Sequence, residues 1–119
     1  METPILKHGN YLIASIQASL TDEELLKLRD SIVERVKKFR SDGVIIDVTV
    51  LDVIDSFAAR TINNTADMIK LCGAETVIVG IQPEVAFAMV QLGLTLKNIK
   101  TALDLEDGFV LLENHSLGK

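Results

Sequence analysis

Two spacings of apolar residues alternate along the chain, and they predict a regular alternation of strands and helices. Runs rich in apolar and β-branched residues predict strands at residues 5–6, 11–16, 44–50, 76–81 and 99–103. Between these runs, apolar residues recur at spacings of three and four and predict helices that begin at residues 21, 56, 83 and 105. Glycines at 43, 73 and 93 suit the ends of the first three helices, and the fourth is expected to end at residue 112.

The order of these elements predicts the fold class. Strands that alternate with helices imply parallel neighbours joined by right-handed crossovers, with helices covering the sheet. The first two strands differ, because His8-Gly9-Asn10 between them suits a hairpin turn and hence an antiparallel pair. Pro4 cannot donate to a neighbouring strand, so the first strand is expected at an edge. We therefore expect an α/β domain with a mixed sheet (an amino-terminal antiparallel strand pair, otherwise parallel strands) and four α-helices packed on it.

Local signals support two of the predicted helices. Thr21 and Glu24 have the spacing of a capping box, in which each side chain bonds to the backbone N–H of the other residue. Pro83 suits the first turn of the third helix. The apolar residues of that helix are expected to face inward, namely Val85, Ala86, Met89, Val90 and Leu92.

Composition and charge narrow the class of protein. The chain has 119 residues, of which 48% are hydrophobic and 24% charged, a globular composition that argues against disorder. At roughly 100–200 residues per domain, we expect one domain over residues 1–119, with a core at about 5–112 and a polar tail at 114–119. The net charge of −5 disfavours nucleic acid and anionic membranes as partners, because both require a basic surface.

The sequence shows no targeting or membrane-spanning pattern. No run approaches the roughly 18 consecutive apolar residues of a membrane span, and residues 1–4 lack the basic and apolar regions of a signal peptide. We therefore expect a cytoplasmic protein. The single Cys72 excludes an internal disulfide and a cysteine-based zinc cluster, and it is expected to be a small buried hydrophobe.

No arrangement of residues indicates catalysis, so we expect a protein that is not an enzyme and that holds no metal or cofactor. His8 lies in the predicted hairpin turn and His115 in the polar tail, and both are expected to be solvated surface residues. Neither has the spacing to pair with a serine, a cysteine or a ligand set. The acidic residues within 104–107 suit the start of a helix, and no glycine-rich loop follows a strand.

Acidic residues cluster at the end of the predicted strand 44–50. Asp47, Asp52 and Asp55 lie where open α/β sheets bind ligands, beyond the carboxyl ends of the strands. The length and the alternation also resemble a response-regulator receiver, in which an aspartate at such a place accepts phosphate. A receiver needs an acidic pair after its first strand, and the residues here are Ile16-Gln17-Ala18. Turn formation and helix capping are the plainer roles of the three aspartates.

Ser56 combines three features: a strand has just ended, a helix begins, and serine is a favoured N-cap residue. Capping alone would account for it. The position also suits a phosphorylation switch, because the N–H groups and dipole at a helix amino terminus favour anions by roughly 0.3–1 kcal/mol. A phosphate would add roughly −1.5 to −2 charges, and Asp52 and Asp55 would oppose it. A partner bound here would lose its contact while the fold remained.

Two stretches of the chain resemble a known family. Residues 44–49 (Val-Ile-Ile-Asp-Val-Thr) and 53–57 (Val-Ile-Asp-Ser-Phe) resemble the core of a STAS domain, the family of anti-sigma-factor antagonists. Residues 80–83 and the segment from 92 to 108 resemble the stressosome branch of that family. The likeness extends from about residue 5 to residue 112. It implies the STAS fold, a mixed sheet with four helices.

The resemblance also implies roles for individual residues. Ser56 would be phosphorylated by a partner serine/threonine switch kinase of the RsbT type, and Asp52, Asp55 and Phe57 would surround that site. Many antagonists have a small residue and then glycine after the modified serine, whereas Phe57-Ala58-Ala59 follows here. This departure favours the stressosome branch over a simple antagonist.

The function implied by the resemblance is that of a scaffold in stress signalling. The protein would self-associate and co-assemble with longer STAS proteins of the RsbR type. It would sequester the kinase and release it when Ser56 is phosphorylated, and a PP2C-type phosphatase would reset the switch. Three alternatives stay open: a simple antagonist of the SpoIIAA type that binds an anti-sigma kinase one-to-one, a metal-dependent receiver, and a small-ligand sensor.

Overall fold

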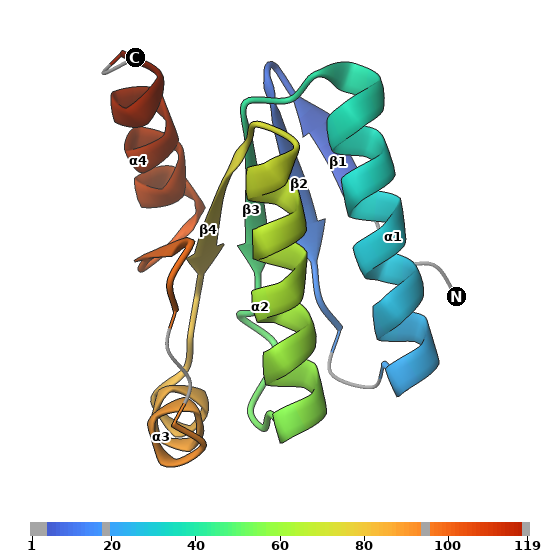
Figure 1. Ribbon diagram of the computed structural model, residues 1–119. Coiled ribbons are helices and arrows are strands. Elements are labelled where there is room, and N and C mark those ends of the chain that lie inside the picture. The colour runs from blue at the N-terminus through green and yellow to red at the C-terminus, as the bar shows by residue number, and fades with distance from the viewer. Residues whose placement is uncertain (1–4, 18–19, 94–95, 118–119) are drawn as a thin grey trace.

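A mixed β-sheet with helices on both faces organises the chain (Figure 1). The structure is a computed structural model that describes residues 5–17, 20–93 and 96–117. Within these ranges, strands and helices follow one another in the predicted order. The strands are β1 (Ile5–His8), β2 (Tyr11–Ser15), β3 (Gly43–Asp47), β4 (Glu75–Val79) and β5 (Ile99–Ala102). The helices are α1 (Asp22–Phe39), α2 (Ser56–Leu71), α3 (Pro83–Gln91) and α4 (Leu105–Leu117).

The strands lie in the order β1-β2-β3-β4-β5. β1 and β2 pair antiparallel, and the pairs β2–β3, β3–β4 and β4–β5 are parallel, which confirms the predicted mixed sheet. β1 lies at an edge as expected, although Pro4 itself lies outside the described residues. β3 lies in the middle, and its residues Val44, Ile45 and Ile46 are at most 1% exposed. Burial of consecutive residues follows from helices that cover both faces of the sheet.

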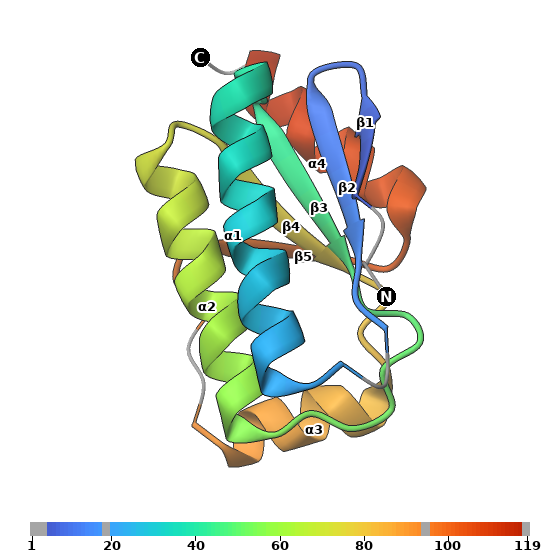
Figure 2. The same cartoon turned by 90° about the vertical axis from the view of Figure 1, so that its right-hand side faces the viewer.

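Each face of the sheet has its own hydrophobic cluster. α1 and α2 lie side by side on one face, and α4 lies on the other (Figure 2). Because side chains of a strand point alternately to opposite faces, Val44 and Ile46 belong to the cluster under α1 and α2. Ile45 belongs to the cluster under α4, together with Leu112 of that helix. The two clusters pack against the parallel strands from both sides, and the loops at the carboxyl ends of the strands leave from this packed sheet.

α1 begins as predicted and ends earlier than predicted. Thr21 Oγ1 accepts from the Glu24 N–H at 3.1 Å, and a Glu24 carboxylate oxygen accepts from the Thr21 N–H at 2.9 Å, which confirms the capping box. The expected stop at Gly43 is wrong, because the helix ends before Arg40, whose φ of 51° is left-handed. Gly43 instead opens β3, where an added Cβ would lie 2.6 Å from a side-chain carbon of Leu112. The glycine therefore allows α4 to pack close to the sheet.

α3 lies across the end of the sheet, near the start of α2 (Figure 2). Its buried face is narrower than the sequence predicts. Val85 is buried and Met89 packs half-buried against the cluster under α1 and α2, as expected, but Ala86, Val90 and Leu92 are exposed. Since this short helix touches the domain along one side only, Ala86 and Val90, which are offset around its axis from Val85, face solvent. Leu92 lies just beyond the last residue of the helix.

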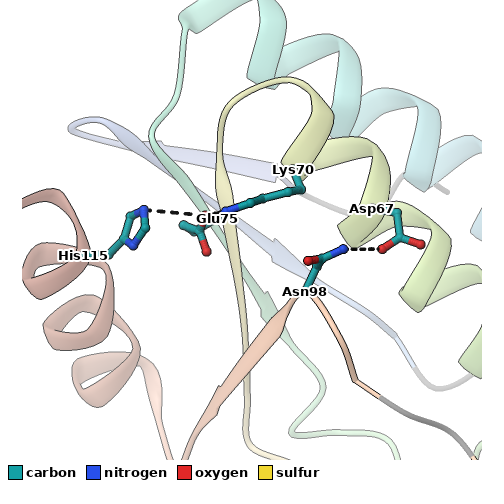
Figure 3. Close-up of polar contacts among 5 residues, drawn as sticks. All are labelled: Asp67, Lys70, Glu75, Asn98 and His115. Atoms are coloured by element: carbon teal, nitrogen blue, oxygen red, sulfur yellow. Dashed lines mark hydrogen bonds and ion pairs between the residues drawn. The ribbon is translucent and has the colours of Figure 1, made fainter. Parts of the chain in front are cut away.

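α4 extends through most of the expected polar tail. The helix continues to Leu117, so the tail predicted at 114–119 is wrong as far as residue 117, and residues 118–119 lie outside the described residues. A contact at the amino end of β4 supports this extension: Nε2 of His115 lies 3.5 Å from Oε2 of Glu75 (Figure 3). The side chain of His115 is only 29% exposed, so it is not the solvated surface residue that was expected.

Glu75 links three elements at the end of the sheet remote from the start of α2 (Figure 3). Its carboxylate accepts a hydrogen bond from Lys70 of α2 and faces His115 of α4. Partial burial raises the pKa of the Glu75 carboxyl, but the Lys70 hydrogen bond and the charges of His115 and Lys70 outweigh burial and hold the pKa below its ordinary value. Nearby, the Asn98 side chain donates to Asp67 of α2 at 2.8 Å and connects the segment before β5 to that helix.

Candidate functional site

The predicted phosphorylation site lies where the connection from β3 enters α2, at the carboxyl ends of the parallel strands (Figure 1). β3 stops at Asp47 rather than continuing to residue 50, because the Asp47 side chain turns the chain. Its Oδ1 accepts from the Thr49 N–H at 2.9 Å and from the Thr49 hydroxyl at 2.6 Å. This is the turn-forming role expected of an aspartate at such a position.

The loop that follows Asp47 packs tightly against the connection after β4. The Val48 N–H donates to the Val79 carbonyl at 3.0 Å, and the Gln82 side-chain amide donates to the Thr49 carbonyl at 2.5 Å. Gly80 has a φ of +79°, and an added Cβ would lie 2.1 Å from Thr49 Oγ1. A glycine at this position therefore lets the two connections meet, and their contact holds the loop that leads into α2.

Asp55, and not Ser56, is the N-cap of α2. The Asp55 backbone is extended (φ −98°, ψ 173°), and its Oδ1 accepts from the Ala58 N–H at 2.7 Å. The prediction that Ser56 is the N-cap is therefore wrong. Both residue types are favoured at this position, but only Asp55 also brings a negative charge to the positive end of the helix dipole. Ser56 becomes the first residue of the helix itself.

The Ser56 hydroxyl is left without a structural hydrogen bond. Among the described residues, no backbone or side-chain group bonds to it, and the residue is half-buried. The first N–H groups of a helix have no partner within the helix, so an anion placed at Ser56 lies near unpaired donors. A charged modification at Ser56 thus removes no bond on which the fold depends.

Charge and apolar packing surround Ser56 on different sides. Asp52 and Asp55 are exposed, so both carboxylates face solvent close to Ser56 in the chain. Phe57 is half-buried and packs against the cluster under α1 and α2, which anchors the first turn of α2 to the core. Of the predicted environment, Asp55 therefore caps the helix, Asp52 contributes surface charge, and Phe57 contributes packing.

A groove of about 230 Å³ opens beside the start of α2. It lies between the segment after β2 and the loop after β3, and Asp55 forms part of its wall. Most of its lining is apolar, including Ile16, Leu20, Leu25, Val53 and Ile54. Sequence reasoning missed this groove, because its residues come from separate segments and each of them alone resembles an ordinary core position.

The other candidate residues form no second site. His8 is exposed, and its ring centroid lies 4.8 Å from that of Phe109 on α4. Cys72 is exposed at the end of α2, so the expectation of a buried residue is wrong. In the described ranges, no group of three or more His, Cys, Asp or Glu residues could hold a metal ion. No helix in the same part of the chain is long and apolar enough to span a membrane.

The mixed five-stranded sheet with its four helices is the fold of a STAS domain. The family model of the STAS domain matches residues 3–108, so the chain belongs to that family. The resemblance found in residues 44–49 and 53–57 is thereby confirmed at the level of the family.

Particular members of the family are similar over nearly the whole chain. A serine-to-glutamate variant of RsbS from Moorella thermoacetica superposes with a TM-score of 0.86 at 28% identity, covering 98% of both chains. A chain from the structure described as the molecular architecture of the stressosome, a signal integration and transduction hub, superposes with a TM-score of 0.83 at 31% identity. That match covers 95% of this chain and 98% of the other.

Sequence comparison also finds similar proteins that are much longer than this chain. The RsbT co-antagonist protein RsbRA of Bacillus subtilis is 29% identical over 99 residues, or 83% of this chain. The co-antagonist RsbRD of the same organism is 35% identical over 72 residues. The chain spans only 36% of the length of RsbRA and 26% of that of RsbRD. The chain is thus similar in sequence to two RsbT co-antagonist proteins and in structure to RsbS and to a chain of the stressosome.

Proposed function

We propose that this protein is a scaffold of a stressosome-type assembly, without enzymatic activity of its own, and that phosphorylation of Ser56 releases a kinase bound to it. One observation carries the proposal: Asp55 caps α2, which leaves the Ser56 hydroxyl free at the start of the helix. A switch needs a group that can change charge without unfolding its host. Ser56 has this property, and it belongs to a surface that also contains an apolar groove.

The proposed reaction is a phosphoryl transfer from ATP bound to the partner kinase. The Ser56 Oγ forms a bond to the γ-phosphorus, the bond from that phosphorus to the bridging oxygen breaks, and ADP leaves. The hydroxyl proton passes to a base on the kinase. Hydrolysis of the phosphoserine by a PP2C-type phosphatase would return serine and inorganic phosphate and reset the switch.

Electrostatics explains how the phosphate would expel a partner. A pair of unit charges 4 Å apart at a protein surface interacts by about 4 kcal/mol, and by less when water intervenes. The phosphate would join the exposed carboxylates of Asp52 and Asp55 and create a strongly hydrated anionic cluster. A partner that covers the groove would have to remove water from this cluster, so its affinity would fall. The fold would remain, because no native bond is lost.

The partners proposed here follow from the relatives. RsbRA and RsbRD are, by name, co-antagonists of RsbT. A protein similar both to them and to a chain of the stressosome would assemble with STAS proteins of the RsbR type and with copies of itself. Together they would sequester a switch kinase of the RsbT type.

Phosphosite mapping tests the proposal. The protein is incubated with its cognate kinase and ATP, and the modified residue is located by mass spectrometry. We expect one phosphate at Ser56 and no labelling of Ser56→Ala. Equal labelling of Ser56→Ala at another residue would contradict the assignment.

Size measurement separates the scaffold from a simple antagonist of the SpoIIAA type. Mixed with an RsbR-type protein, a scaffold sediments in an assembly many times the mass of either chain. An antagonist instead forms a small one-to-one complex with an anti-sigma kinase, and that outcome would refute the scaffold.

A further inference from the structure

The outward face of α2 carries a polar stripe that begins at the switch residue. Ser56, Arg60, Asn64 and Asp67 follow one another at spacings of four, four and three, which places them on one side of the helix. The opposite side carries the buried residues, such as Ile62 and Ile69. Arg60 is exposed, so its guanidinium lies at the surface one turn after Ser56.

The geometry of a helix brings the Arg60 side chain toward Ser56. Residues four apart have Cβ atoms about 5–6 Å from each other. Helical side chains lean toward the amino terminus, so a long side chain covers the turn that precedes its own Cα. For Arg60 that turn starts at Ser56. An anion placed four residues before a cation is also the more favourable order, because it agrees with the helix dipole.

Arg60 has no competing partner in the part of the chain that the structure describes. The ion pairs there join Lys27 to Glu23, Arg29 to Asp30, and Glu75 to both Lys70 and His115. The guanidinium of Arg60 takes part in none of them and donates no hydrogen bond within these residues. Arg29 of α1 lies near the middle of α2, beside Thr61 and Thr65. Its guanidinium donates a hydrogen bond to Asp30 and is therefore already paired.

The loop that leads into α2 carries negative charge close to Ser56 in the chain. Asp52 and Asp55 are exposed on this loop. These carboxylates oppose the second ionisation of a phosphate on Ser56. A cation beside the phosphate would offset this repulsion and favour the doubly charged form.

We propose that Arg60 is the positioning residue of the switch: its guanidinium binds the phosphate on Ser56 and holds it, as a dianion, against the first turn of α2. The inference deepens the proposed function and takes from it only the identity of the modified residue. Arginine suits the task because its planar donors match phosphate oxygens in pairs. The unmodified hydroxyl carries no charge, so the pair forms only after phosphorylation.

The second pKa of the phosphate reports this contact directly. Phosphoserine is incorporated at position 56 of the full chain during synthesis, so no kinase is needed, and the ³¹P chemical shift is titrated against pH at low salt. We expect the pKa to rise by about 0.2–0.4 in Arg60→Gln, the equivalent of a helical ion pair four residues apart. Arg60→Lys should restore part of the difference, and about 1 M salt should abolish it.

Lys37→Gln is the matched control. It removes one positive charge from an exposed position near the end of α1, which lies at the far end of the domain from Ser56 (Figure 2). Its phosphate pKa should equal that of the parent protein. An Arg60→Gln pKa equal to the parent value would overturn the role of Arg60, and so would an equal rise in both variants.

The two proposals can fail separately. If the kinase modifies another residue while Arg60→Gln still raises the pKa of the incorporated phosphate, the proposed function fails and the Arg60 contact stands. If the kinase modifies Ser56 while the phosphate pKa is the same in Arg60→Gln as in the parent protein, the proposed function is supported and the Arg60 contact is refuted.

Discussion

Replacing Ser56 with alanine is expected to leave the stability of the domain nearly unchanged, whereas the same change one residue earlier is expected to lower it. The Asp55 carboxylate caps α2 through its 2.7 Å bond from the Ala58 N–H. Loss of an N-cap side chain costs typically about 1 kcal/mol, and loss of a negative charge at a helix start costs about 0.3–1 kcal/mol. Asp55→Ala should therefore lower the free energy of unfolding by about 1–2 kcal/mol.

Two further variants separate the contributions. Asp55→Asn keeps an oxygen that can accept from the Ala58 N–H but loses the charge, so it should cost only about 0.3–1 kcal/mol. Ser56→Ala removes no hydrogen bond and should change the free energy of unfolding by less than about 0.5 kcal/mol. Thr21→Ala, which breaks the observed capping box of α1, is a positive control with an expected cost of about 1 kcal/mol.

Urea unfolding followed by circular dichroism gives these free energies. In a domain of this size, 1 kcal/mol corresponds to about 4 °C in melting temperature, so thermal scans provide a second measurement. A cost for Ser56→Ala as large as that for Asp55→Ala would refute the reasoning, because the hydroxyl would then be a structural group and not a free one.

Three other predictions concern the same domain. Gly80→Ala should destabilise more than Gly73→Ala, since both have positive φ but only Gly80 meets Thr49; the backbone strain costs about 1–2 kcal/mol in each, and the clash adds about 1–3 kcal/mol. Equal losses in urea unfolding would disprove the contact. The pKa of Glu75 is lowered in the folded state, so its stabilisation is present above the ordinary carboxyl pKa near 4.5 and is lost as pH falls. Glu75→Gln should flatten the acid dependence of unfolding, and an unaltered profile would contradict this. Ser56→Asp should keep its fold by circular dichroism yet bind the kinase poorly in calorimetry; undiminished affinity would count against the switch.

The fold was largely predictable from the chain, because its strands and helices differ in period. The apolar run at 44–46 predicts a strand, and the three-and-four spacing predicts α1 and α2. The alternation of these elements then implies parallel strands. The ends of elements were less predictable. α4 continues to Leu117 in part because of a contact between His115 and Glu75, residues far apart in the sequence.

The position of the candidate site in the chain could be predicted, but the identity of its N-cap residue and the neighbouring groove could not. Asp55 and Ser56 are adjacent and both favour the N-cap, so the choice between them depends on which residue takes the extended backbone that precedes the helix. The groove that reaches Asp55 requires the segment after β2 to approach the loop after β3. A pattern along one chain does not encode that approach, because it arises from packing between distant segments.

The most direct test of the central claim measures how much kinase stays bound to the assembled scaffold after ATP is added. The protein, an RsbR-type partner and the kinase are assembled and sedimented, and the kinase in the pellet is quantified as phosphate accumulates on Ser56. We predict that the kinase leaves wild-type assemblies in step with phosphorylation and stays on Ser56→Ala assemblies. Equal release from both, or retention on fully phosphorylated wild-type protein, would contradict the claim.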